Sequence, residues 1–178
     1  MLKRVTINLV FDYPNEKVLM IRKLRGMRGF GSTVDGHGKD KYNFPGGKKE
    51  KHESFYDCGA REIFEETNLV VRKSDLVLAG QLWFVWPDGT VLRSPVFKTD
   101  KFSGAIGQKT DECIPEWVDI SKIPYENMWA NDKVWLSKAL AGEKFNWEII
   151  FAPDDTFTIR ELPLDFRAGL ESLRKRAG

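Results

Sequence analysis

The sequence predicts an α/β fold in which a mixed β-sheet carries helices on its faces. Strand-like apolar runs occur in pairs joined by turn residues, and two stretches with helical character lie between and after these strands. The chain has 178 residues, of which 42% are hydrophobic, so it is long enough for one well-buried core and short for two. We therefore expect a single domain.

The first pair of strands is expected at residues 5–11 and 17–21, where apolar residues alternate or run together. The Asp-Tyr-Pro-Asn sequence at 12–15 is turn-forming, so the two strands should form a hairpin. Residues 25–41 are rich in glycine and poor in apolar residues, which predicts a mobile loop.

Residues 54–67 have a helical period. An apolar stripe that should face the sheet recurs at i, i+3, i+4 and i+7, and consists of Tyr56, Gly59, Ala60 and Ile63. The acidic residues fall on the other flank. Asn68 follows directly and fits a left-handed C-terminal cap, for which asparagine is the usual substitute for glycine.

The rest of the chain predicts further strands and one more helix. Strands are expected at residues 76–86, 91–102, 116–118, 145–151 and 156–162. The first two of these are joined by Pro-Asp-Gly at 87–89, and the last two should form a closing hairpin. The second helix should begin with Asn131 or Asp132 as its cap, run to about Leu140 and end at Gly142.

The first helix carries a cluster of carboxylates. Glu62, Glu65 and Glu66 stand at i, i+3 and i+4, so they share one flank and repel one another unless cations lie between them. Oxygen ligands with room left for water and phosphate suit Mg²⁺, with Mn²⁺ as the alternative. An acidic helix flank is more often a solvated surface, but a surface would not require Gly47, Glu53 and Arg61 at fixed offsets.

The segment 47–69 resembles the Nudix box. It reads Gly47, five residues, Glu53, seven residues, and then Arg-Glu-Ile-Phe-Glu-Glu-Thr-Asn-Leu, and it departs from the family pattern only at Asn68, where the family has glycine. The resemblance implies an α/β/α sandwich spanning residues 1–178 as one Nudix hydrolase domain, with a basic tail at about 165–178. Asn68 keeps the required backbone conformation accessible.

Short segments outside the box resemble one branch of this family, the MutT homologues that hydrolyse oxidised purine nucleoside triphosphates. They are residues 28–31, Asn43 with 46–48, 80–81, 111–112, 123–124 and 128–132. The resemblance implies Mg²⁺-dependent attack of water on the β-phosphorus of a purine nucleoside triphosphate, with 8-oxo-dGTP or dGTP as the expected substrate. The products would be a monophosphate and pyrophosphate, and the role would be nucleotide pool sanitation, an 8-oxo-dGTP diphosphatase activity.

Catalytic and metal-binding roles follow from residue type and from the resemblance. Glu62 and Glu66 are one turn apart and are the first candidates for metal ligands. Arg61 can reach Glu53 and Glu65, which should fix the carboxylate geometry. The full catalytic set expected is Glu53, Arg61, Glu62, Glu65, Glu66 and Glu112, and the metal ligands expected are Gly46 through its carbonyl, Glu62, Glu65, Glu66 and Glu112.

Binding of the purine base requires flat apolar walls and a few fixed polar groups. The candidate walls are Phe30, Phe84, Trp86 and Trp129, although core packing is an equal alternative for Phe84 and Trp86. The candidate polar contacts carried over from the branch are Thr6, Asn43, Asn131 and Asp132. The branch has two adjacent acids at the positions of residues 131 and 132, whereas the Asn131 amide cannot change its protonation state. We therefore expect this protein to accept fewer oxidised purines than the branch does, with a preference for guanine.

Composition excludes several other classes of function. A formal net charge of +2 gives no field for binding a nucleic-acid polymer, and no apolar run reaches the length of a membrane span. The start of the chain lacks the apolar centre of a signal peptide, so we expect a soluble cytoplasmic protein, either monomer or homodimer. Two alternatives stay open: hydrolysis of another nucleoside diphosphate derivative, such as a nucleotide sugar or dinucleotide, and a non-catalytic nucleotide sensor.

Overall fold

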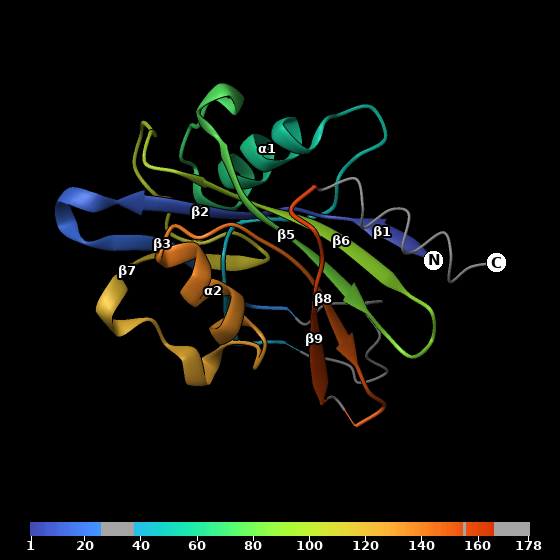
Figure 1. The fold of residues 1–178 in the computed structure, drawn as a ribbon. Coiled ribbons are helices and arrows are strands. Elements are labelled where there is room, and N and C mark those ends of the chain that lie inside the picture. Colours follow the sequence, from blue (N-terminus) through green and yellow to red (C-terminus); the bar gives the residue numbers. More distant parts are fainter. Residues whose placement is uncertain (26–37, 155, 166–178) are drawn as a thin grey trace.

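The computed structural model of the protein describes residues 1–25, 38–154 and 156–165. In this part of the chain, nine strands form one sheet with α1 (Phe55–Thr67) on one face and α2 (Asp132–Leu140) on the other (Figure 1). The strands are β1 (Leu2–Arg4), β2 (Ile7–Asp12), β3 (Lys17–Lys23), β4 (Tyr42–Asn43), β5 (Val77–Val85), β6 (Val91–Thr99), β7 (Cys113–Asp119), β8 (Phe145–Phe151) and β9 (Phe157–Glu161). Short 3-10 helices are η1 (Tyr13–Asn15), η2 (Lys73–Asp75), η3 (Ile120–Lys122) and η4 (Tyr125–Asn127).

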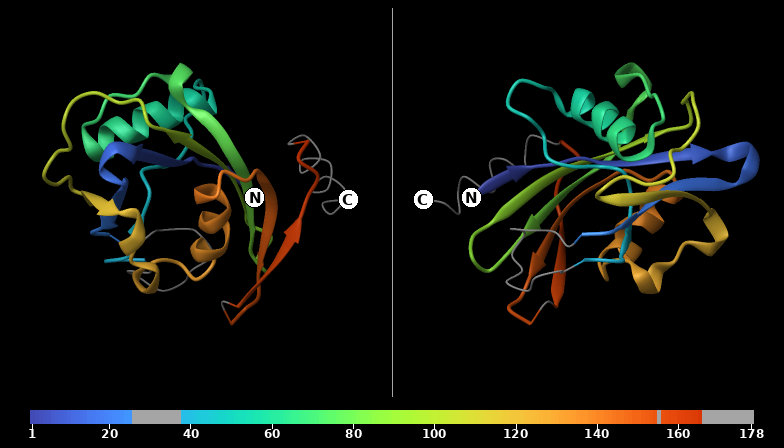
Figure 2. Two further views of the ribbon diagram at one scale, coloured as in Figure 1. Left: turned by 60° about the vertical axis from the view of Figure 1, so that its left-hand side comes forward. Right: turned by 180° about the vertical axis from the view of Figure 1, so that it is seen from behind.

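The sheet is mixed, as predicted. Its main path runs β4-β3-β2-β6-β5-β8-β9, while β1 pairs with β6 and β7 pairs with β3. The β1–β6, β2–β6 and β5–β8 pairs are parallel, and the other pairs are antiparallel. Figure 2 shows from two further directions that α1 and α2 stay on opposite sides of the sheet.

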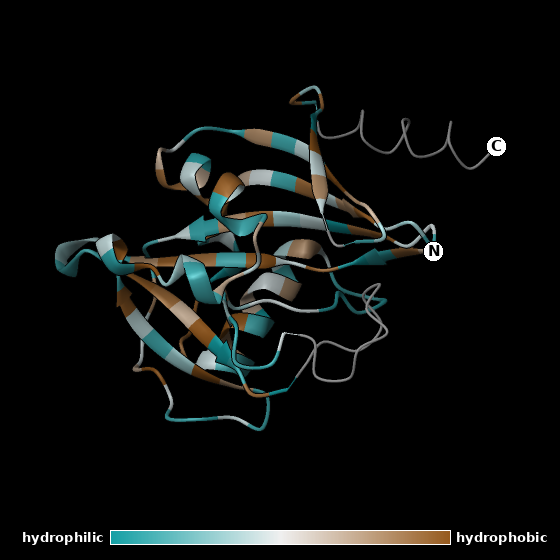
Figure 3. Ribbon diagram, turned by 90° about the horizontal axis from the view of Figure 1, so that it is seen from below, coloured by the Kyte–Doolittle hydropathy of each residue, from teal (hydrophilic) through white to brown (hydrophobic). Residues whose placement is uncertain are grey.

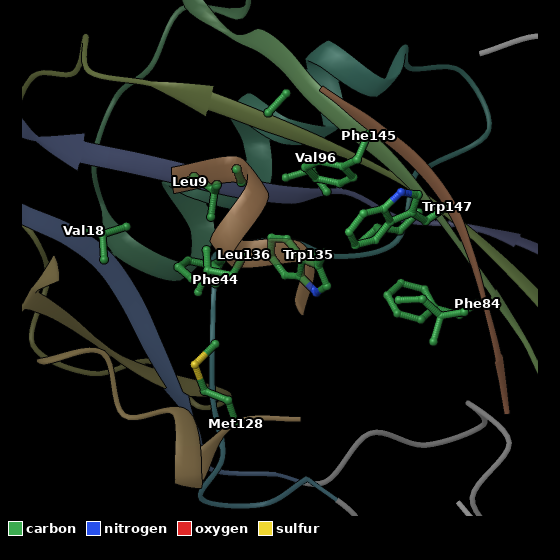
Figure 4. Packing of buried hydrophobic residues seen from close by; sticks show 14 of the residues in the cluster. Leu9, Val18, Phe44, Phe84, Val96, Met128, Trp135, Leu136, Phe145 and Trp147 are labelled. Carbon is green, nitrogen blue, oxygen red and sulfur yellow. The ribbon is translucent and has the colours of Figure 1, made fainter. Parts of the chain in front are cut away.

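Alternation along the strands builds two hydrophobic cores. On β2, Leu9 and Phe11 pack into the core under α2, whereas Val10 points to the opposite face and packs with Ile63 of α1. The hydropathy colouring in Figure 3 shows this as bands that change along each strand. In the larger core, Trp135 of α2 lies among aromatic side chains from the sheet (Figure 4). The two faces of the sheet are therefore separate environments.

The predicted hairpins are confirmed. Phe11 pairs with Val18 across the first one, and Val91 pairs with Val85 across the second, whose turn places Gly89 at φ +77°. The last hairpin joins β8 and β9. The strand expected to include residues 116–118 is present as β7, where Lys17–Lys23 of β3 pairs along the whole of Cys113–Asp119.

Helix α1 begins and ends as the sequence predicts. The Ser54 hydroxyl accepts a hydrogen bond from the Asp57 amide, and the Asp57 carboxylate accepts one from the Ser54 amide, so the two residues form a capping box. At the other end Asn68 adopts φ +66° as the left-handed cap.

The predicted inward stripe of α1 is only partly correct. Gly59 and Ile63 are buried, but Tyr56 is 40% exposed and covers the edge of Phe97, with ring centroids 4.6 Å apart. Cys58, Glu66 and Thr67 are buried as well. The helix buries a wider face than the apolar stripe indicates, because distant segments cover it: Thr6 lies against Cys58, Lys23 against Glu66, and the Gly107 amide donates to the Thr67 carbonyl.

Most of the glycine-rich loop expected at 25–41 lies outside the described residues, as do Phe30 and nearly all of the expected basic tail. In the part of the chain that the structure describes, no helix is long and apolar enough to cross a membrane.

Candidate active site

Glu62 and Glu66 of α1 both face the short Gly46-Gly47 segment that follows β4. The Gly46 amide donates to Glu66 Oε2 at 2.8 Å. A β-carbon built on Gly47 would lie 2.4 Å from Glu62 Oε2, so the carboxylate lies directly against this glycine. The side chains of Glu62 and Glu66 are only 12% and 7% exposed. The helix thus brings two carboxylates to one side, as expected for residues one turn apart.

Arg61 fixes the first of these carboxylates. Its guanidinium donates to both oxygens of Glu53, from Nε at 3.1 Å and from Nη2 at 2.8 Å. Nη1 donates to Glu62 Oε1 at 2.9 Å and to Glu65 Oε2 at 2.8 Å, and Nη2 also donates to the Lys48 carbonyl. The Arg61 hydrogen bonds lower the pKa of Glu53 to about 2, so both partners stay charged. The predicted contact between Arg61 and Glu53 is present.

Lys23 holds the second carboxylate, a contact that no pattern in the sequence predicts. Its Nζ lies 2.8 Å from Glu66 Oε1, and the lysine side chain is 17% exposed. Burial alone would lower the pKa of Lys23, but the Glu66 charge and hydrogen bond outweigh this and raise it. No spacing rule relates the last residue of β3 to a helix 43 positions away.

Arg61 and Lys23 do not fully offset the cost of burying the charged carboxylates of Glu62 and Glu66. Burial raises the pKa of Glu62 to about 7 against the opposing effect of Arg61, and burial also raises the pKa of Glu66 in spite of Lys23. Among the described residues, no donor bonds to Glu62 Oε2. A buried anion pair with a free oxygen fits a hard divalent cation such as Mg²⁺, which would relieve the cost of ionising both groups.

Three carboxylates of α1 were expected to converge, but Glu65 does not join Glu62 and Glu66. Glu65 is 55% exposed and its carboxylate turns toward Arg61, because position 65 lies on the outer side of the helix. Among the described residues, no group of three or more His, Cys, Asp or Glu side chains could hold a metal ion. A cation here would rely on Glu62, Glu66, backbone oxygen and oxygen atoms of water or phosphate.

Glu112 lies at the edge of this site. It is exposed in the turn before β7, and its carbonyl accepts from the Leu24 amide next to Lys23 at 2.8 Å. After burial, its charge is among the influences that raise the pKa of Glu66. It therefore lies near the pair without belonging to a preformed ligand cluster.

A groove of about 950 Å³ opens beside Glu62. Its lining residues are Lys48, Lys49, Glu50, Lys51, His52, Glu53, Arg61 and Glu62. Lysine side chains are compact charges that suit phosphate oxygens, so one wall of the carboxylate site is basic. This groove is separate from the aromatic residues considered for a base.

Phe84 of β5 and Trp86, which directly follows this strand, lie side by side, as alternation of side chains at i and i+2 predicts. Their ring centroids are 6.1 Å apart, and Trp86 stacks on Phe151 of β8 at 5.1 Å with an interplanar angle of 15°. Phe84 is buried in the core under α2, whereas Trp86 and Phe151 are half-buried at its edge. Phe84 and Trp86 were each expected either to pack in the core or to form a wall of the base pocket. The position of Phe84 fits core packing, and the position of Trp86 fits a wall better. Phe151 was missed, although alternation along β8 places it on the same face.

The segment before α2 is tightly buried. Asp132 accepts from the Trp135 indole at 2.9 Å and from the Trp129 amide at 3.2 Å, and burial raises its pKa to about 7. Asp132 is the first residue of α2, while Asn131 stands at the cap position and makes no side-chain capping hydrogen bond, so the predicted side-chain cap is not formed. Asn131 is 5% exposed, and among the described residues its Oδ1 has no hydrogen-bond partner. The Trp129 ring lies 5.2 Å from Lys41 Nζ.

The position of Thr6 argues against a purine contact. Its hydroxyl lies 3.7 Å from Cys58 Sγ of α1 and accepts from Asn8 Nδ2 at 3.3 Å. Thr6 therefore points to the face of the sheet opposite Phe84, because successive side chains of a strand alternate. Asn43 lies on β4, half-buried, and its Oδ1 accepts from the Phe44 amide at 2.8 Å, which leaves its amide nitrogen as the group available to a ligand.

Comparison with known proteins places this site in a family. Residues 2–139 match the NUDIX domain model. The oxidized purine nucleoside triphosphate hydrolase of Danio rerio is 34% identical over 116 residues, which cover 65% of this chain and 72% of the relative. The protein of the same name from Mus musculus is 28% identical over 136 residues, covering 74% and 85%.

Solved structures share the fold. The MutT protein of Bacillus halodurans superposes with a TM-score of 0.70 at 24% identity, covering 90% of this chain and 98% of that one. The MutT protein of Methanosarcina mazei Go1 gives a TM-score of 0.61 at 22% identity, covering 79% and 94%. With the domain match over most of its length and the carboxylates of the motif facing one segment, the chain belongs to the Nudix hydrolase family.

Proposed function

We propose that the protein hydrolyses purine nucleoside triphosphates, with 8-oxo-dGTP or dGTP as substrate, to the monophosphate and pyrophosphate in a Mg²⁺-dependent reaction. The observation that carries the proposal is the pair Glu62 and Glu66, both retained, both little exposed and both facing Gly46-Gly47. The names of the two curated relatives support the choice of an oxidised purine triphosphate.

The residues of the chain would divide the work as follows. Glu62 and Glu66 hold the cation, Arg61 and Glu53 keep Glu62 in place, and the basic groove beside them receives the phosphates. When bound, Mg²⁺ supplies Lewis-acid polarisation and a more acidic water. Although Arg61 also lines the groove, its guanidinium donates to carboxylates, so its main role would be to orient the site.

The purine would lie against the half-buried aromatic residues at the edge of the α2 core. Trp86 and Trp129 offer flat walls, and Asn131 Oδ1, which has no hydrogen-bond partner among the described residues, would accept a hydrogen bond from the base. The N–H groups on the guanine edge supply such a donor, and the Asn131 amide nitrogen can donate to O6. Since an amide keeps one fixed donor and one fixed acceptor, the site favours guanine over oxidised adenine.

A nucleotide panel tests this proposal. The purified protein is incubated with Mg²⁺ and 8-oxo-dGTP, dGTP, 2-oxo-dATP, dCTP, ADP-ribose or a diadenosine polyphosphate, and pyrophosphate and nucleotide products are measured. Preferred release of pyrophosphate from the guanine triphosphates supports the proposal. Preferred release of a sugar phosphate or of two mononucleotides indicates the other pyrophosphohydrolase class, and no cleavage at all indicates a nucleotide sensor.

A further inference from the structure

The Lys23 ammonium occupies a place where a cation is needed. Its Nζ lies 2.8 Å from Glu66 Oε1, in a site where the two acidic side chains are almost fully covered. A divalent ion that binds Glu66 through the same oxygen would come close to this ammonium. Two positive charges a few ångströms apart repel each other, so the ammonium weakens binding of the ion for as long as it stays on Glu66.

We propose that Lys23 acts as an internal competitor for the divalent ion: it neutralises Glu66 in the metal-free protein and must move away for the metal to bind. The inference rests on the proposed function only in assuming that Glu66 is a metal ligand. Lys23 is then a positioning residue that sets the metal affinity of the free enzyme, and it prevents a buried carboxylate from being left without a partner.

The surroundings of the two side chains allow this exchange. The Gly46 amide holds Glu66 Oε2 at 2.8 Å, so the carboxylate keeps its orientation when Oε1 changes partner. The backbone of Lys23 is fixed by hydrogen bonds to Lys41 and Asp40 and by pairing with Cys113, so only the flexible side chain has to move. The exposed Glu112, whose charge already acts on Lys23, offers the ammonium a second anion nearby.

The test measures Mn²⁺ binding to the free protein, without any nucleotide, by calorimetry or by paramagnetic resonance. Replacing Lys23→Met should lower the Kd for Mn²⁺ by about tenfold, because the competing charge is gone. Lys23→Gln, which keeps a hydrogen-bond donor for Glu66 but no charge, should show a similar gain, and it serves if the methionine variant does not fold. Lys23→Arg should stay close to the original affinity.

Two controls make the result specific. Lys122→Met removes an exposed lysine and its 2.8 Å ion pair with Asp119 outside the site, and it should leave the Kd unchanged. In a Glu66→Gln background, Lys23→Met should no longer improve binding. An unchanged or higher Kd in both neutral Lys23 variants overturns the proposal. Since no substrate is present, this outcome is independent of which nucleotide the enzyme cleaves.

Discussion

The Glu62 carboxylate lies against Gly47 so closely that a β-carbon there would meet Oε2 at 2.4 Å. Gly47→Ala must therefore displace the carboxylate, and we expect kcat to fall by about 100-fold while the fold persists. Steady-state kinetics and a thermal melt measure both effects. Gly107→Ala is the matched control, because its β-carbon would make an ordinary 3.6 Å contact. Equal activity of both variants would contradict the role assigned to Gly47.

The planar guanidinium of Arg61 bonds several carboxylates at once, which a lysine ammonium cannot do with the same geometry. Arg61→Lys keeps the charge but loses simultaneous bonds to Glu53 and Glu62, so we expect a 10- to 100-fold loss of kcat, roughly the usual cost of losing a partner that orients a metal ligand. The KM for the nucleotide should change little, since the donors of Arg61 are engaged with the carboxylates of Glu53, Glu62 and Glu65. Arg72→Lys, at an exposed position, is the control. A change confined to KM would instead indicate that Arg61 binds substrate.

Asp132 should make stability depend on pH. Burial raises its pKa from 3.8 to about 7. Between these values the folded protein keeps a proton that the unfolded chain has lost, so rising pH lowers the free energy of unfolding through this residue. Asp132→Asn removes this dependence at a constant cost of one hydrogen bond.

Urea unfolding at about pH 4 and about pH 8 measures the effect. Relative to the unchanged protein, the free energy of unfolding of Asp132→Asn should rise by on the order of 3 kcal/mol from the lower pH to the higher pH, at about 1.4 kcal/mol per pKa unit. The exposed Asp100→Asn variant should show no such relative rise. Parallel pH profiles for the unchanged protein and Asp132→Asn would show that Asp132 stays ionised throughout.

Asn131 should determine the choice of purine. Its buried Oδ1 lacks a partner among the described residues, and the amide cannot exchange a proton with Asp132. Asn131→Asp should raise kcat/KM for 2-oxo-dATP relative to 8-oxo-dGTP by about tenfold, because a carboxyl can accept or donate according to its protonation. If the unchanged protein already turns over both nucleotides comparably, Asn131 does not restrict the base.

The sequence predicted the fold well where local patterns decide it. Period-two alternation and turn residues located the three hairpins, and the capping residues Ser54 and Asn68 delimit α1. Which residues of α1 are buried was harder to predict. Tyr56 is exposed and Glu66 is buried, because Glu66 is covered by contacts from distant parts of the chain, the Lys23 side chain and the Gly46 amide.

The position of Glu62 and Glu66 on one side of α1 was foreseen because it depends on spacing within one helix, whereas Glu65 turns toward Arg61 and does not join them. Lys23 could not be foreseen, because its contact with Glu66 exists only when β3 folds against the helix. Thr6 was assigned by likeness to a branch, but its side chain, just before β2, points toward α1. Phe151, which stacks on Trp86, could have been found from alternation along β8.

The central claim is that Glu62 and Glu66 together hold a divalent ion for cleavage of a purine triphosphate. The most direct test is pyrophosphate release from 8-oxo-dGTP with Mg²⁺, compared among the unchanged protein, Glu62→Gln and Glu66→Gln at equal folded concentration. We predict steady release by the unchanged protein and a loss of more than about 100-fold in each variant. Undiminished release by both variants, or no release by the unchanged protein, would contradict the account.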